Sequence, residues 1–339
     1  MSGASLSTSS TLDAMDAQIV RCVQIAPRAP FSAIGAVLGV AEQTVARRYR
    51  RLRRDGLLRV TMAVDPRAMG VTVWTVRVRC RPEGAVGIAQ ALARRDDVAW
   101  VTVYSAGWEV VFNLRALNEA DASDLLTRML PKAAPVLDVS SAAVLHTFVG
   151  GGAADWAGLR SVLTAEQEAA MGDTRPSREP GRDPGPLTDE DRALLPHLQI
   201  DGRAPVSTLA RLTGQPAHRI SRRLDALLAS GVAYLDVDVA RVLSGQQSVL
   251  LWLSVQPGRL AETGSALAAH PAVPFAAAIT GPTNLVASVL TEDVTGIYGF
   301  VTGALAAMPG VTGYETAPAL RQFKQAGSLV HGDRLVPAR

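Results

Sequence analysis

The chain is an internal duplication. When its 339-residue sequence is shifted by 175 residues, it aligns with itself without a gap. Identical residues recur at matching positions in both halves, as in the pairs Leu12 and Leu187, Asp16 and Asp191, Arg28 and Arg203, Gly39 and Gly214, Arg48 and Arg223, Gly56 and Gly231, and Phe148 and Phe323. Each copy is far longer than the roughly 20–50 residues of a solenoid repeat. The chain must therefore fold as two similar modules, each made of several elements.

The first part of each copy predicts three helices and an extended segment. In copy one, apolar residues recur at helical spacing over about 13–25, 32–38 and 42–54, and residues 57–64 are expected to form a wing strand. Gly39 stands between the second and third helices, where a tight turn favours glycine. Copy two repeats the pattern over 189–199, 207–212 and 217–229. This is the order of a winged helix-turn-helix, whose last helix enters the major groove of DNA.

The third helix of copy one is strongly basic. Residues 42–54 contain six arginines and one glutamate, a net charge of +5. A guanidinium suits both phosphates and the guanine edge, so we expect double-stranded DNA as the partner. The candidate DNA-binding residues of this helix are Gln43, Thr44, Arg47, Arg48, Arg50, Arg51 and Arg54. In copy two they are His218, Arg219, Arg222 and Arg223, with a net charge of only +2 over 217–229. A merely solvated basic face is the alternative interpretation.

The second part of each copy predicts the element order βαββαβ. Strand and helix periodicities alternate over 71–80, 83–94, 98–105, 109–114, 118–130 and 139–148, and again over 249–255, 260–269, 273–280, 285–290, 294–307 and 314–323. This order is ferredoxin-like. Two helices cover one face of such a sheet, and we expect the second copy to cover the other face. The fold class is therefore α+β, with two copies of a winged helix-turn-helix plus a ferredoxin-like sandwich domain.

These patterns divide the chain into seven segments. We expect a disordered tail over 1–11, winged helix-turn-helix units over 12–59 and 187–234, and αβ domains over 60–148 and 235–324. A helix plus a flexible linker is expected over 149–186, where Thr164 and Gln167 have the spacing of a capping box and 172–186 holds four prolines and three glycines. Residues 325–339 are expected to form a C-terminal tail.

The composition excludes several classes of protein. The two cysteines, Cys22 and Cys80, lie far apart, so neither a disulfide scaffold nor a cysteine zinc site is expected. The five histidines show no metal-ligand spacing, and we expect no metal and no cofactor. The chain has no signal-peptide pattern and no apolar run of about 18 residues. We therefore expect a cytoplasmic protein with no membrane partner.

Taken together and found twice, these motifs resemble the Lrp/AsnC (feast/famine) family of transcription regulators. The resemblance rests on Leu12-Asp13 with Asp16, on Thr188-Asp189-Glu190-Asp191, on Asp201-Gly202-Arg203, on Thr44-Val45 with Arg48 and Leu52, and on the turn Thr280-Gly281-Pro282-Thr283-Asn284. The sequence departs from the family where Ala41 and Pro216 replace the serine that caps the third helix. The acidic residue of the family's turn is Glu109 in copy one and Asn284 in copy two.

The resemblance implies dimerisation through the αβ domains and an amino-acid or small-metabolite effector near that interface. Because one chain holds both halves, we expect an intramolecular pseudo-dimer, and further association of chains stays open. The effector is expected between the αβ domains, held by Ser105, Ala106, Gly107, Trp108 and Glu109 and by Thr280, Gly281, Thr283 and Asn284. Glycine lets a carboxylate approach backbone N–H groups, and Glu109 suits an ammonium group. Plain turns with a solvated Glu109 are the alternative.

An enzyme of this fold is the competing interpretation. Proteins similar to the family act as siroheme decarboxylases, with histidine and arginine side chains of the αβ domain. Copy one has no histidine before His146, and His270 of copy two is followed by Pro271. No G-x-S-x-G, P-loop or H-E-x-x-H motif is present. We therefore expect a regulator and not an enzyme; a ligand sensor with weakened DNA binding is a third possibility, which the poorer helix of copy two permits.

Overall fold

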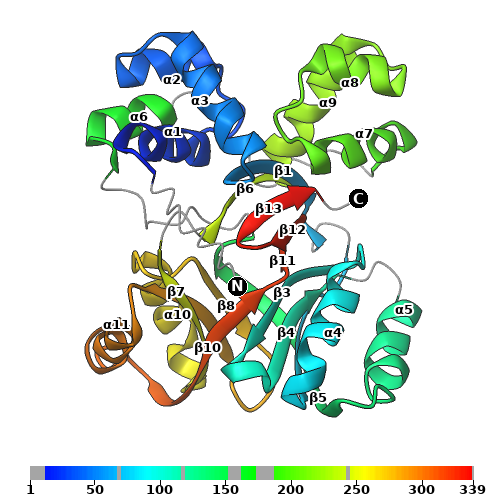
Figure 1. Cartoon of the computed structure of the whole chain (residues 1–339), viewed down its shortest axis with the longest axis vertical. Coiled ribbons are helices and arrows are strands. Elements are labelled where there is room, and N and C mark those ends of the chain that lie inside the picture. Colours follow the sequence, from blue (N-terminus) through cyan, green and yellow to red (C-terminus); the bar gives the residue numbers. More distant parts are fainter. Residues whose placement is uncertain are drawn as a thin grey trace, which may run out of the picture.

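The computed structural model describes residues 12–66, 70–115, 119–151, 162–172, 187–241 and 245–337. The expected tail over 1–11 and the linker over 173–186 lie outside these ranges. Figure 1 shows two small helical units side by side at one end of the molecule and a strand-rich body with flanking helices at the other. We call the helical units head one and head two, and the body the barrel.

The two heads confirm the predicted three-helix pattern. Their third helices begin after Ala41 and Pro216, which make no side-chain cap, as the departure from the family pattern predicts. Gly39 and Gly214 end the second helices with left-handed φ values of 68° and 70°. Head one consists of α1 (Ala14–Ile25), α2 (Phe31–Leu38) and α3 (Glu42–Arg54), and head two of α7 (Asp189–Ile200), α8 (Val206–Thr213) and α9 (Ala217–Ser230).

The helix between the copies belongs to head one. It is α6 (Ala165–Gly172), which lies within the segment 149–186 where a helix was expected. The predicted capping box is confirmed, because the backbone N–H of Gln167 donates to Thr164 Oγ1 and that of Thr164 to Gln167 Oε1. Met171 is fully buried in the core of head one, and Glu168 pairs with Arg21 of α1 at 2.9 Å.

The segments expected to form wings pair with each other instead. β1 (Leu58–Val64) and β6 (Ala233–Val239) form an antiparallel ribbon that runs from the pair Leu58 and Val239 to the pair Val64 and Ala233. The wing prediction is therefore wrong, and the domain boundaries at 59/60 and 234/235 cut through strands. The ribbon joins the two cores, because Val60 packs into head one while Met62 packs into head two.

The two βαββαβ units close into one eight-stranded barrel with the strand order β10-β3-β4-β2-β5-β8-β9-β7. The predicted element order is confirmed in both copies, and the sheet of each copy meets that of the other at the seams β5–β8 and β3–β10. Copy one contributes β2 (Trp74–Cys80), α4 (Pro82–Ala93), β3 (Val98–Tyr104), β4 (Glu109–Leu114), α5 (Glu119–Asp124) and β5 (Val136–Val149). Copy two contributes β7 (Gln247–Val255), α10 (Leu260–Ala269), β8 (Phe275–Ile279), β9 (Leu285–Thr291), α11 (Val294–Gly299) and β10 (Val311–Gln322). A π-helical turn continues α5 over Leu125–Met129 and α11 over Phe300–Leu305.

The C-terminal segment is not a tail, contrary to the prediction for 325–339. It forms a three-stranded sheet of β11 (Lys324–Gln325), β12 (Ser328–His331) and β13 (Arg334–Pro337). Leu335 is 3% exposed in the core of head one, and its backbone N–H donates to Gly56 O at 2.8 Å. The hydroxyl of Ser328 donates to the buried Asp238 of β6 at 2.8 Å. Burial of Leu335 and these hydrogen bonds dock the segment on head one and on the ribbon.

Candidate functional site

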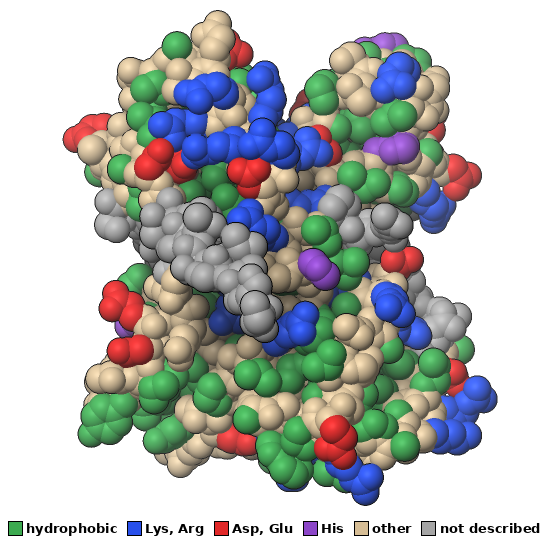
Figure 2. Space-filling view, in the orientation of Figure 1, with side chains coloured by type: hydrophobic (Ala, Val, Ile, Leu, Met, Phe, Trp, Pro, Cys, Tyr) green, Lys and Arg blue, Asp and Glu red, His purple; other side chains and the backbone are tan. Residues whose placement is uncertain are grey.

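The exposed face of α3 carries two unpaired guanidinium groups. Arg47 and Arg50 are exposed, and neither has a carboxylate partner within the part of the chain that the structure describes. Gln43 is exposed beside them, and Thr44 is half-buried. Figure 2 shows basic side chains gathered on head one and toward the gap between the heads, with fewer on head two. This face can contact phosphates without first breaking an internal ion pair.

Other arginines of α3 hold head one together. Arg48 donates to Asp13 at 2.6 Å and to Asp16 at 2.8 Å, and Arg51 also donates to Asp16. Asp16 is 3% exposed, so these bonds tie α3 to the first turn of α1. The hydrogen bond from Arg48 lowers the pKa of Asp13, and the hydrogen bond to Asp13 raises the pKa of Arg48. Arg48 and Arg51, both expected on DNA, therefore have structural partners in the free protein.

The remaining basic residues of α3 are also paired. Arg54 contacts the carboxylate of its neighbour Asp55 at 2.9 Å. Arg53 reaches head two, where it pairs with Asp201 at 2.8 Å. The net charge of this helix therefore overstates the number of arginines that are free for DNA.

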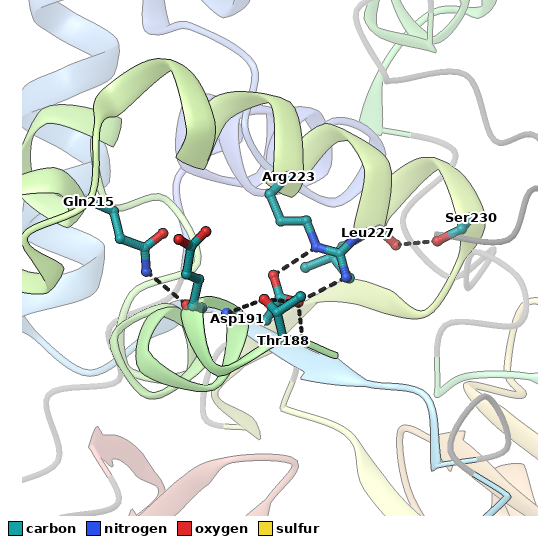
Figure 3. Close-up of polar contacts among 7 residues, drawn as sticks. Thr188, Asp191, Gln215, Arg223, Leu227 and Ser230 are labelled. Carbon is teal, nitrogen blue, oxygen red and sulfur yellow. Dashed lines mark hydrogen bonds and ion pairs between the residues drawn. The ribbon is translucent and has the colours of Figure 1, made fainter. Parts of the chain in front are cut away.

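Head two repeats the internal pair and loses most of the free charge. Arg223 donates to both oxygens of Asp191 at 2.8 Å, and Asp191 forms a capping box with Thr188 (Figure 3). Burial opposes the ionisation of Asp191, but the hydrogen bonds from Arg223 and Thr188 outweigh it and lower the pKa. Arg219 pairs with Glu190 at 3.0 Å. His218 and Arg222 are exposed, and Arg222 has no carboxylate partner among the described residues.

The two turns expected to bind an effector lie at different seams of the barrel. Ser105–Gly107 follows β3 at the β3–β10 seam, and Thr280 follows β8 at the β5–β8 seam. Around the barrel, three strands separate β3 from β8 in either direction. The structure therefore does not bring the two turns into one pocket.

Two polar side chains of the second turn, Thr280 and Asn284, are engaged within the protein. Thr280 Oγ1 accepts from the backbone N–H of Ala143 at 2.9 Å. The amide of Asn284 bonds both the N–H and the C=O of Val255, at 2.9 Å and 2.8 Å. In the other turn Ser105 and Ala106 have left-handed φ values of 50° and 56°, Gly107 follows at 97°, and Trp108 is 54% exposed. Gly281 and Thr283 complete the second turn, where the φ of Gly281 is 113°.

Glu109 is paired with Arg77, an arginine that no sequence motif had selected. Arg77 of β2 donates to Glu109 at 2.6 Å and 3.1 Å, and also binds Glu315 of β10. Its guanidinium lies 5.4 Å from the centroid of the Trp252 ring. The hydrogen bond with Glu315 contributes most to raising the pKa of Arg77. Because Glu109 is 7% exposed and already paired, an ammonium ligand would have to displace Arg77 to reach it.

Family models match both kinds of domain in the chain. The AsnC-type helix-turn-helix domain matches residues 12–53, which form most of head one, and the Lrp/AsnC ligand binding domain matches residues 248–329, in copy two. Both matched domains are those of the Lrp/AsnC family. The resemblance drawn from the sequence motifs is thereby confirmed.

Its Lrp/AsnC relatives match less than half of the chain. The HTH-type transcriptional regulator FL11 of Pyrococcus horikoshii is 26% identical over 146 residues, which are 42% of this chain and 96% of the relative. The HTH-type transcriptional regulator LrpA of Pyrococcus abyssi is 25% identical over 137 residues, 40% of this chain and 97% of the relative. Among solved structures, the siroheme decarboxylase NirDL has a TM-score of 0.61 at 15% identity and covers 93% of each chain. That similarity extends the shared fold over nearly the whole chain.

Two histidines of the barrel, His146 and His270, pack against aromatic rings. The ring of His146 packs edge-on against Phe148 at 4.7 Å, and that of His270 against Phe300 at 5.0 Å. His270 also accepts from the backbone N–H of Ala272, and burial lowers its pKa. Over the described ranges, no group of three or more His, Cys, Asp or Glu side chains could hold a metal ion, and no helix is long and apolar enough to cross a membrane.

Proposed function

We propose that this Lrp/AsnC protein regulates transcription by binding double-stranded DNA through α3 and α9, with head one dominant. The proposal rests on a difference between two pairs of arginines on α3. Arg48 and Arg51 are bound to carboxylates of α1, whereas Arg47 and Arg50 face solvent without such partners. Exposed guanidinium groups on a helix of this position suit phosphate and base-edge contacts.

The two heads differ in their exposed basic residues, and this difference supports an asymmetric DNA site. Under the 175-residue shift, Arg47 corresponds to Arg222, but Arg50 corresponds to Asp225. One free cation is thus conserved between the heads and the other is replaced by an acid. A symmetric homodimer reads two related half-sites, whereas this chain has no physical need for a palindromic site.

We also propose that one chain is the complete two-headed unit, a pseudo-dimer. The ribbon β1–β6 and both barrel seams are contacts between the copies of a single chain. A protease site inserted within 173–186 tests this: after cleavage, the two halves should stay together in native mass spectrometry at submicromolar concentration. Separation of the halves, or exchange of a half with intact chains, would show that the pairing is weak or occurs between chains.

We propose that a small metabolite modulates the DNA binding and that the protein is not an enzyme. The fold is shared with NirDL at 15% identity, which does not extend to chemistry. The ring packing of His146 and His270 supports the regulatory interpretation, because these histidines have structural partners. Incubation of the protein with siroheme under reducing, anaerobic conditions should release no carbon dioxide, and release above a protein-free control would overturn this part of the proposal.

The DNA-binding proposal is tested by selecting fragments from a genomic library of the source organism. Wild-type protein should retain a limited set of fragments, and Arg47→Ala with Arg50→Ala should lose them. Arg259→Ala is a matched control, because it removes an exposed arginine of the barrel that pairs with Glu262. If wild-type protein retains no fragment even at low salt, or if the control loses as much as the α3 variants, the proposal fails.

A further inference from the structure

A large cavity lies between the mouth of the barrel and the heads. Its volume is about 880 Å³, within the range of small-molecule sites. Strands of both copies line its lower part, and β6, α1, α9 and the loop after α1 line its upper part. It is distinct from both turns that the sequence suggested, since none of the residues Ser105–Glu109 or Thr280–Asn284 lines it.

The duplication makes the two walls of this cavity directly comparable. Where the wall of copy one has Thr75 and Arg115, the matching positions of copy two have Leu250 and Leu290. A third pair, Asn113 and Ser288, keeps the larger amide on the side of copy one. The wall of copy one is therefore more polar and more cationic at these positions than the wall of copy two, so an occupant with one polar edge has a preferred orientation.

The polar wall is ordered and holds a strained aromatic residue. Thr75 Oγ1 lies 3.2 Å from Asn113 Oδ1, which leaves the amide N–H groups of Asn113 available to the cavity. Trp100 lines the cavity at an irregularity of β3, with a left-handed φ of 55°. Non-glycine residues rarely adopt this conformation, and strain of this kind concentrates at ligand sites. Gln24 Oε1, on a lining residue of α1, is buried and has no hydrogen-bond partner among the described residues.

The charges around the cavity favour an anion. The basic lining residues are Arg21, Arg28, Arg115 and Arg241, and the acidic ones are Asp225 and Asp236. Burial raises the pKa of Asp236 more than the neighbouring Arg115 lowers it. Burial therefore favours the neutral carboxyl, which repels a bound anion less than an exposed carboxylate would. Arg21 is neutralised by Glu168. Four basic side chains thus line the cavity against two acidic ones.

We propose that this cavity is the effector site, and that it takes an organic anion with an apolar body. Its carboxylate faces Arg115 and Asn113, and its body packs on Leu250, Phe275 and Val286. The inference rests on the proposed regulatory function, which it deepens by naming the site and the ligand class. Because the ribbon strand β6 and the Pro27–Pro30 loop of head one also line the cavity, an occupant contacts the elements that set the spacing of the heads.

The fluorescent probe 8-anilinonaphthalene-1-sulfonate, an aromatic anion, tests the site, with the uncharged N-phenyl-1-naphthylamine as its comparator. Wild type should bind one anionic probe per chain. Arg115→Leu, which copies Leu290, should weaken the anionic probe about tenfold, the loss expected for one charge-assisted hydrogen bond, and leave the uncharged probe unchanged. Val286→Trp should fill the apolar side and abolish binding of both probes. Trp108→Ala, in the turn of copy one, should change neither.

Melting temperature and near-ultraviolet circular dichroism must show that each variant is folded. Probe binding that survives Val286→Trp in a folded protein, or that is lost with Trp108→Ala, overturns the assignment of the site. Equal weakening of both probes by Arg115→Leu overturns the preference for an anion. Retention of DNA fragments is measured separately. If the protein binds DNA but not the probe, the cavity proposal alone is wrong. If it binds the probe but not DNA, the regulatory function alone is wrong.

Discussion

Arg28 and Arg203 each hold the loop that carries the other. Arg28 donates to the carbonyl oxygens of Gly202 and Ala204, which flank Arg203, and Arg203 donates to those of Pro27 and Ala29, which flank Arg28. The two residues occupy the same position in the two copies. Arg203 also lies 4.6 Å from the ring centroid of Phe31. This reciprocal contact joins the heads through backbone acceptors, so it is independent of the side chains that diverged between the copies.

Replacing Arg203 by Met should therefore loosen both heads. We expect a loss of about 2–3 kcal/mol, because two carbonyl groups lose a charged donor and a cation–π contact disappears. Hydrogen–deuterium exchange should accelerate in both loops, 27–30 and 201–205, and hardly in the barrel. Arg28→Met should show the same pattern with a smaller loss, and an effect confined to the substituted loop would contradict a reciprocal contact.

Substitutions on α3 should separate DNA contacts from structural ones. Arg47→Ala and Arg50→Ala should each reduce the slope of log affinity against log salt by about 0.9, the value for one lost phosphate contact, at unchanged melting temperature. Arg48→Ala should instead destabilise head one by about 1–3 kcal/mol, because the buried Asp16 loses a hydrogen bond. In head two, Arg222→Ala should cost less affinity than Arg47→Ala. Equal losses at the two heads would refute the dominance of head one.

The Asp191–Arg223 pair should make head two sensitive to acid. The folded state lowers the pKa of Asp191, so the pair stabilises at pH values above the unfolded value of 3.8 and its contribution is lost as the pH falls through the folded pKa. Asp191→Asn should therefore reduce stability at neutral pH, and the difference from wild type should shrink as the solution is acidified below 3.8. Thermal melting across this range measures it; a difference that is independent of pH would exclude ionisation as the cause.

Asp238 of the ribbon should respond to pH in the opposite direction. Burial, reinforced by the neighbouring Asp236, raises its pKa well above 3.8, whereas Ser328, Arg59 and Gln325 only partly oppose this. The folded state thus favours the protonated form, and stability is lost as the pH rises from 3.8 through the folded pKa. Asp238→Asn should stabilise the protein at neutral pH, and this advantage should vanish at pH values below 3.8. A variant that melts lower than wild type at neutral pH would show that the charge is compensated.

The C-terminal sheet should contribute to the stability of head one. Leu335→Ala should cost about 2–5 kcal/mol, as expected for a leucine that is 3% exposed in a core. His331→Ala, an exposed position of the same sheet, is the control and should change stability by less than about 0.5 kcal/mol. Exchange of the Gly56 region should accelerate only in the Leu335 variant, since the backbone N–H of Leu335 donates to Gly56.

The elements that the sequence predicted are those whose signal is local. Helical spacing, strand alternation and the turn glycines Gly39 and Gly214 set the three-helix heads and the βαββαβ order without reference to distant residues. The wing prediction was wrong because the segment 57–64 has the same pattern whether it pairs within its own head or with 233–239. The tail prediction was wrong because the burial of Leu335 depends on head one, far away in the sequence.

The candidate site was predicted at the level of the helix and not of the individual side chain. The charge of α3 located the basic face, but a count of arginines cannot show that Arg48 and Arg51 turn toward Asp13 and Asp16 of another helix. Likewise the turn motif selected Glu109, while its partner Arg77 comes from β2, and Glu315, the second carboxylate bound to Arg77, comes from the other copy. The helix face depends on local periodicity, whereas these pairings depend on which elements the fold brings together.

All eight strands of the barrel come from one polypeptide, and this removes a degree of freedom that two-chain regulators retain. Separate subunits can be exchanged among related proteins of the same cell, so that mixed assemblies read mixed sites. Here the partner of each head is encoded in the same gene and synthesised in equal amount. The proportion of one head to the other cannot vary with expression, and each head can diverge without having to fit a copy of itself.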